Sequence, residues 1–187
     1  MSFNIVGEPQ GDAALEDPFG LLIGMALDQQ FPMERAFAGP AKILERFGTL
    51  DPAAIAAADP EEFAAMAATT PAIHRFPASM AGKIQAIARA VVEDYDGDAA
   101  RIWKEAPDGA ALVKRIQALP AFGKQKAQIF TALIAKQCGV QPQGWEKAVG
   151  DYALSGYRSV ADVVDSVSLQ KVREYKQMKK AAAAKTD

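Results

Sequence analysis

Residues that begin and end helices divide this sequence into short segments, and the apolar residues between them recur with helical spacing. Asp51-Pro52 and Asp59-Pro60 each pair an N-cap side chain with a proline at the first helical position. No segment alternates apolar and polar residues as a half-buried strand does, apart from a short extended piece expected at 3–6. The clearest helical period follows Pro18, with apolar residues at Phe19, Leu22, Ile23, Ala26 and Leu27. The sequence therefore predicts an all-α fold of many short helices.

The same signals place the other helices. A proline or a small capping residue stands before the expected starts, and a glycine follows several of the expected ends. In chain order we expect a helix from Pro32 to Phe47, a long helix from Ser79 to about Gly97, helices over 109–118 and 124–138, two final helices capped by Ser159 and Ser168, and a frayed tail at 181–187.

Length and composition restrict the kinds of site that the chain can hold. Its 187 residues, half of them hydrophobic, suffice for one domain or two lobes with a shared core. Cys138 is the only cysteine and His74 the only histidine, which excludes an internal disulfide, a four-cysteine cluster and a two-histidine metal site. No apolar run approaches the roughly 20 residues of a membrane span, and no secretory signal opens the sequence. We expect a soluble protein.

The net charge of −2 is unevenly distributed along the chain. Residues 1–100 carry a net charge of −9, whereas 101–147 carry +5 and 148–187 carry +2. An acidic chain is not a general nucleic-acid binder, but the basic second half has the charge to meet phosphates. The same lysines and arginines fit solvated helix faces equally well.

The most informative segment is IQALPAFGKQKAQIFTALIAKQ, residues 116–137. It predicts two amphipathic helices joined by a tight turn that contains proline and glycine. Free N–H groups at the start of the second helix favour an anion, and Gly123 permits close approach of the backbone. Lys124 and Lys126 add positive charge there, so the hairpin is able to hold a DNA strand by its phosphates. An ordinary packing hairpin fits the same residues.

The motif LPAFGKQKA resembles the L-P-G-V-G-x-K-x-A hairpin of the helix-hairpin-helix base-excision DNA glycosylases, the superfamily of endonuclease III and 3-methyladenine glycosylase II. Residues 18–37 resemble that family's early helix and Gln-containing loop, and 80–98 resemble its long helix before the hairpin. The three segments come in family order at family-like spacing and together span 18–140. The resemblance implies an all-α, two-lobed helix-hairpin-helix fold.

The resemblance also implies how the chain is organised. We expect one unit over 1–187, with a helical-barrel lobe at 18–140 that includes the hairpin, and a second lobe made of 1–17 and 141–187. Some members carry an iron–sulfur cluster on four cysteines, which this chain lacks. It is therefore expected to be a cluster-free member that uses no cofactor or metal.

Members of this family kink duplex DNA, flip the damaged nucleotide out of the helix and fill the gap with side chains. The gap-filling glutamine of the early loop corresponds to Gln30, with Gln29 beside it. In members that also cleave the strand, a lysine stands where this chain has Gln125, so strand cleavage is not expected. By resemblance, the residues expected to contact DNA are Gln29, Gln30, Arg75, Ala121, Gly123, Lys124, Gln125 and Lys126; the family usually has glycine at the position of Ala121.

The family's catalytic aspartate has no direct counterpart in this chain. It stabilises the positive charge that develops on the sugar or activates water, and it lies 18–22 residues after the hairpin glycine, where 141–145 hold no carboxylate. Glu146 and Asp151 are the nearest replacements. Trp145 is a candidate for stacking on a flipped base, although packing between the lobes explains it equally well.

These observations predict a monofunctional DNA N-glycosylase that acts in base-excision repair on duplex DNA with a damaged or abasic site. It is expected to be a monomer in the bacterial cytoplasm, associated with the nucleoid. Because the aspartate is missing, a catalytically silent lesion-binding protein is the first alternative. A helical interaction protein that does not bind DNA is the second.

Overall fold

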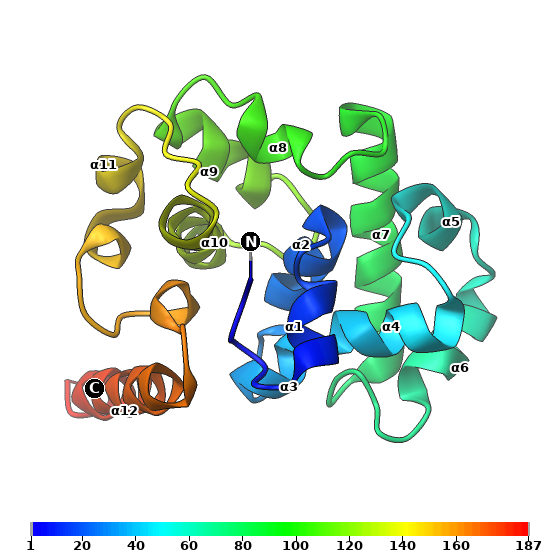
Figure 1. Cartoon of the computed structure of the whole chain (residues 1–187), viewed down its shortest axis with the longest axis horizontal. Helices are drawn as coiled ribbons and strands as arrows, with labels where there is room; N and C mark the ends of the chain where they lie inside the picture. Colours follow the sequence, from blue (N-terminus) through cyan, green and yellow to red (C-terminus); the bar gives the residue numbers. More distant parts are fainter. Residues whose placement is uncertain (1, 187) are drawn as a thin grey trace.

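The computed structural model describes residues 2–186, and every regular element in that range is a helix (Figure 1). The predicted all-α fold is therefore confirmed. The elements are α1 (Pro9–Ala14), α2 (Pro18–Leu27), α3 (Met33–Phe37), α4 (Gly39–Phe47), α5 (Pro52–Ala57), α6 (Pro60–Ala68), α7 (Pro77–Tyr95), α8 (Arg101–Lys104), α9 (Gly109–Gln117), α10 (Lys124–Gln137), α11 (Trp145–Val149), the 3₁₀ helices η1 (Gly150–Ala153) and η2 (Val160–Asp162), and α12 (Ser166–Ala184).

Aspartate side chains begin many of these helices. Asp51 accepts the N–H of Ala54, and Asp59 accepts the N–H groups of Glu61 and Glu62, as their positions before proline predict. Such a cap typically contributes about 1 kcal/mol, because it satisfies N–H groups that have no partner within the helix. Five helices have an aspartate at the N-cap whose side chain accepts a first-turn N–H: Asp17, Asp51, Asp59, Asp108 and Asp165.

Five local predictions differ from the structure. The segment expected as one helix from Pro32 is two, α3 and α4, since Pro40 in the first turn of α4 has no N–H to continue the earlier helix. Ser79 lies inside α7, which starts two residues earlier at a proline. Ser168 lies in the first turn of α12, where it forms a capping box with the N-cap Asp165. The tail expected at 181–187 is helical as far as Ala184, and the piece at 3–6 forms no strand.

Two groups of helices pack around a common core (Figure 1). In one group α7 is flanked by α5 and α6, while α4 packs on α1 and α2. In the other, α10 packs against α9, α11 and the 3₁₀ helices. These contacts place the hairpin beside the C-terminal elements and α1 beside α4.

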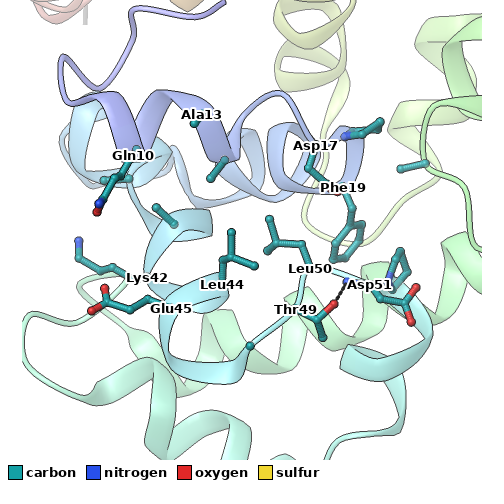
Figure 2. Close-up of a pocket in the computed structure, with 18 of the residues that line it drawn as sticks. Gln10, Ala13, Asp17, Phe19, Lys42, Leu44, Glu45, Thr49, Leu50 and Asp51 are labelled. Atoms are coloured by element: carbon teal, nitrogen blue, oxygen red, sulfur yellow. Dashed lines mark hydrogen bonds between the residues drawn. The ribbon is translucent and has the colours of Figure 1, made fainter.

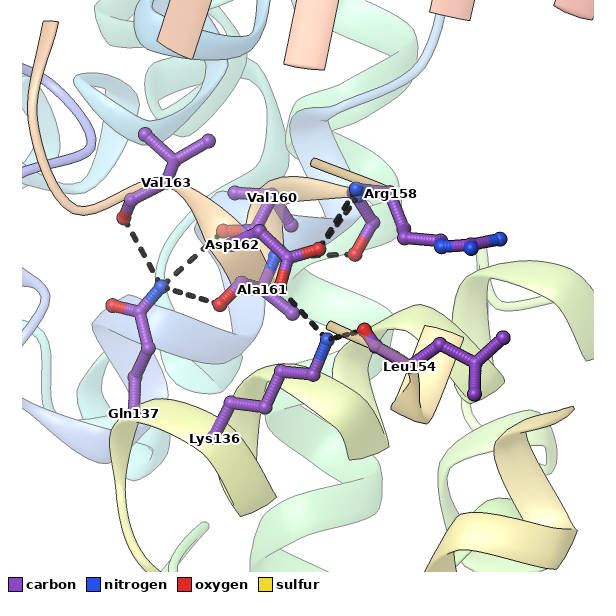
Figure 3. Close-up of polar contacts among 9 residues, drawn as sticks. Lys136, Gln137, Leu154, Arg158, Val160, Ala161, Asp162 and Val163 are labelled. Atoms are coloured by element: carbon purple, nitrogen blue, oxygen red, sulfur yellow. Dashed lines mark hydrogen bonds and ion pairs between the residues drawn. The ribbon is translucent and has the colours of Figure 1, made fainter. Parts of the chain in front are cut away.

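A polar cluster joins α10 to the segment that leads into α12 (Figure 3). Lys136 Nζ donates to the carbonyl of Leu154 at 2.8 Å and pairs with Asp162 at 2.7 Å. The neighbouring Gln137 amide donates to three carbonyls, those of Val160, Ala161 and Val163. Since both side chains extend from the end of α10, the hairpin determines where the chain after η2, and hence α12, is held.

No helix within residues 2–186 has the length and hydropathy that crossing a membrane requires.

Candidate nucleic-acid interface

The predicted hairpin is formed by α9, a turn at 118–123 and α10. Leu119 and Phe122 are buried and anchor the turn in the core. Gly123 is the exposed N-cap of α10, and no side chain caps this helix. A Cβ added to Gly123 would meet no atom within 4 Å. The first N–H groups of this 14-residue helix therefore have no side-chain cap and follow an exposed residue, an arrangement that suits a bound phosphate.

Ala121 adopts the backbone conformation that glycine favours. Its φ of +69° lies in the left-handed region, which costs an L-residue roughly 1–2 kcal/mol. The turn therefore keeps the shape that a glycine would have at this position, even though the chain carries a methyl group there.

The two hairpin lysines lie in different surroundings. Lys124 is exposed at the first position of α10. Lys126 is half-buried, and its Nζ donates to the carbonyl of Ala26 near the end of α2 at 2.7 Å. Burial lowers the pKa of Lys126 to about 8, against the opposing attraction of Asp28. Lys124 is thus available to solvent, whereas Lys126 turns inward and links the hairpin to α2.

A cavity of about 560 Å³ lies where the hairpin, the end of α2 and α12 meet. Its charged lining is mostly basic, with cations contributed by α10, by α12 and by the segment before η2. Tyr175 lies between two of them, Arg158 at 5.8 Å and Lys179 at 5.4 Å from the ring centroid. The charged residues that line it are Asp28, Lys124, Lys126, Arg158, Lys176 and Lys179.

Nothing in the sequence of α12 predicted that this helix belongs to the region. Its lysines resemble those of any solvated helix, and the Lys136–Asp162 pair, which fixes the segment before α12, helps to hold the helix beside the hairpin. A second ion pair, between Arg173 of α12 and Glu34 of α3, joins α12 to the first half of the chain.

The loop after α2 presents the glutamine that was expected to fill the gap. Gln30 is exposed and has a left-handed φ of +53°. His74 supports the loop from behind, because its Nε2 donates to the carbonyl of Gln29 at 2.8 Å. Its Nδ1 accepts the N–H of Phe76 at 3.0 Å, which requires the neutral ring. Burial lowers the pKa of His74, which favours the same state.

His74 thereby connects the glutamine loop to the start of α7. Phe31 packs on the His74 ring at 4.9 Å between centroids. Phe76 is 49% exposed, which is unusual for so large an apolar side chain, and the guanidinium of Arg75 lies over its ring at 5.3 Å. One buried imidazole therefore joins the backbone of Gln29, the residue before Gln30, to that of Phe76.

The remaining predicted residues lie around this region. Gln125 donates to the Tyr152 hydroxyl at 2.8 Å, and both line the cavity. Glu146 and Asp151 are exposed and are not among the residues that line it. Trp145 is 8% exposed and packs so closely on α9 that a Cβ on Gly109 would collide with its backbone. This burial favours the packing role for Trp145.

A larger cavity of about 990 Å³ lies between α1, α4 and the segments around residues 50 and 98 (Figure 2). In the part of the chain that the structure describes, Lys42 is the one cation that lines it, whereas Asp17, Glu45 and Asp51 are three of several carboxylates there. Such a surface disfavours phosphates, whereas the basic cavity beside the hairpin favours them.

Uncapped helix N–H groups, a basic cavity beside them and an exposed glutamine loop thus belong to one region of the structure. The family model of HhH-GPD superfamily base excision DNA repair proteins matches residues 23–186. The chain belongs to this superfamily. The match spans the glutamine loop, the hairpin and α12, so the candidate interface of this HhH-GPD protein lies within the family region. No significant match was found among curated proteins or among solved structures.

Within residues 2–186, no three side chains of the metal-binding kinds cluster closely enough to hold a metal ion.

Proposed function

We propose that this base excision DNA repair protein is a DNA N-glycosylase that binds duplex DNA with one nucleotide flipped out of the helix. The observation that carries the proposal is the uncapped, exposed start of α10 beside the basic cavity. A phosphate bound at Gly123 would bring the adjoining sugar and base toward that cavity, since Gly123 is part of its lining.

The glutamine loop supports the flipped geometry. Gln29 lines the cavity, and Gln30 follows it in an exposed, left-handed conformation. An amide both donates and accepts hydrogen bonds, so Gln30 is suited to face the base left without a partner. The glutamine loop would occupy the gap while the cavity receives the displaced nucleotide.

The proposal is tested by binding to two matched duplexes at fixed salt, one with a neutral tetrahydrofuran abasic analogue and one undamaged. We expect at least tenfold preference for the abasic duplex. Equal affinity for both would refute the flipped geometry.

Lys124→Ala then tests the hairpin. It should weaken binding to both duplexes alike and make the slope of log K against log salt about one unit shallower, because one phosphate contact is lost. The matched control is Lys147→Ala on α11, which is exposed but is not among the residues that line the cavity. An unchanged slope in Lys124→Ala would refute the hairpin contact.

A lesion-binding protein without catalysis is the second candidate, because Glu146 and Asp151 both lie outside the lining of the cavity. Release of a damaged base from labelled duplexes under single-turnover conditions separates the two. Base release that is lost in Glu146→Gln would exclude the silent alternative and identify that carboxylate.

A further inference from the structure

Among the described residues, 2–186, the lining of the cavity beside the hairpin includes one carboxylate, and it comes from the end of α2. Asp28 follows the last residue of α2 and lines the cavity together with Gly123 and Lys126. Only 10% of its side chain is exposed. The other acidic residues considered for catalysis, Glu146 and Asp151, are exposed and outside this lining.

This position is an unfavourable one for a carboxylate in a protein without a ligand. Asp28 lies at the C-terminal end of α2, where the helix dipole disfavours negative charge. Its ion-pair partner, Lys176 Nζ, is 3.8 Å away, which is longer than a hydrogen bond. Burial raises the pKa of Asp28. The positive charges of Lys176 and Lys126 act in the opposite direction but do not cancel the rise. A buried, loosely paired carboxylate in a cleft is characteristic of a group kept for function.

We propose that Asp28 is the carboxylate that acts on the sugar of the flipped nucleotide. This inference rests on the proposed glycosylase function. In the reaction, a water oxygen bonds to C1′ as the bond from C1′ to the base nitrogen breaks, and the base leaves with the bonding electron pair. Asp28 accepts the proton that the water loses, and the departing base takes up one proton from solvent, so atoms and charge balance. Before that transfer, the Asp28 anion stabilises the positive charge that develops on the sugar.

The two neighbouring lysines are compatible with this role. Lys176 is about half-exposed and only loosely paired, so a DNA phosphate can draw it away from Asp28. Lys126 is held by the carbonyl of Ala26 at 2.7 Å, so its ammonium group already has a hydrogen-bond acceptor other than Asp28. Binding of DNA would therefore leave the Asp28 carboxylate free to face the sugar.

The test needs no knowledge of the damaged base. It compares the affinity for two abasic duplexes, one with the neutral tetrahydrofuran analogue and one with a positively charged pyrrolidine in its place. The pyrrolidine imitates the charge of the reacting sugar, so a carboxylate beside it favours the charged analogue. Asp28→Asn has nearly the same shape without the charge, and Glu174→Gln, an exposed change on α12, is the matched control.

We expect the unaltered protein and Glu174→Gln to prefer the pyrrolidine duplex by tenfold or more. Asp28→Asn should reduce this preference to less than twofold while its affinity for the neutral duplex stays within threefold, which also shows that the variant is folded. The inference is overturned if Asp28→Asn keeps the preference, if Glu146→Gln or Asp151→Asn abolishes it, or if the unaltered protein shows none. Failure to bind either abasic duplex would instead overturn the proposed function, and this inference with it.

Discussion

Gly123→Ala is expected to weaken DNA binding while leaving the stability of the fold nearly unchanged. The added methyl group meets no atom within 4 Å, and the φ of −86° suits any residue. Alanine is a poorer N-cap than glycine by a few tenths to about 1 kcal/mol. Alanine also lowers the conformational entropy of the unfolded chain, which stabilises the folded state by a similar amount. The free energy of unfolding should therefore change by less than about 1 kcal/mol.

The same methyl group stands where a phosphate must approach the first N–H groups of α10. If it displaces one charge-assisted hydrogen bond, the loss is about 1.5–3 kcal/mol, or roughly 10- to 150-fold in Kd. Fluorescence anisotropy with the neutral abasic duplex measures this loss, and urea unfolding of the same sample measures stability.

Gly82→Ala is the matched control, because it too adds a methyl group in open space, within α7 and outside the hairpin. It should leave Kd within about twofold. If Gly123→Ala is folded and binds as tightly as the unaltered protein, the backbone at Gly123 does not hold a phosphate and the reasoning fails.

Three further predictions concern stability. Ala121→Gly relieves the left-handed strain and should raise stability by up to about 1 kcal/mol, seen as a rise of roughly 2–4 °C in Tm; a lower Tm would contradict it. Lys136→Met should cost about 2–4 kcal/mol in urea unfolding, because it leaves the carboxylate of Asp162, only 9% exposed, without its cation; a loss below 0.5 kcal/mol, on the order of a surface change, would show that the cluster does not hold the segment. His74 has a lowered pKa, so the unfolded chain takes up its proton first and stability should fall as pH drops below about 6.5, by at most about 1.4 kcal/mol per pH unit. The difference in unfolding free energy between pH 7.5 and 5.5 should be smaller in His74→Gln, and equal differences would refute this role.

Much of the local structure could be predicted because its signals lie within a few residues of each other. Asp51 and Asp59 stand directly before proline, and both cap helices as expected. The hairpin was predicted within one residue at each end, since its turn carries proline and glycine between two amphipathic stretches. The boundary between α3 and α4 was not predicted. Pro32 and Pro40 can each begin a helix, and the spacing of apolar residues between them fits one helix as well as two.

The candidate site was predicted less completely than the fold. From its position in the motif, Lys126 was predicted to contact a phosphate. Whether its side chain points to solvent or toward α2 depends on the helices packed around it, and in the structure it points toward α2. No sequence pattern marked Asp28 as functional, because a polar residue is common at the C-terminus of a helix.

By itself, the sequence determined the helical class, the caps and the hairpin with its exposed glycine, because backbone hydrogen bonding and capping act over short distances along the chain. Tertiary structure alone decided that Asp28, Lys126 and Lys176 share one cavity, since residues so far apart in sequence meet only through packing. The sequence gives the chemical type of each ionisable side chain. Its partners, its burial and hence its pKa come from the helices that surround it.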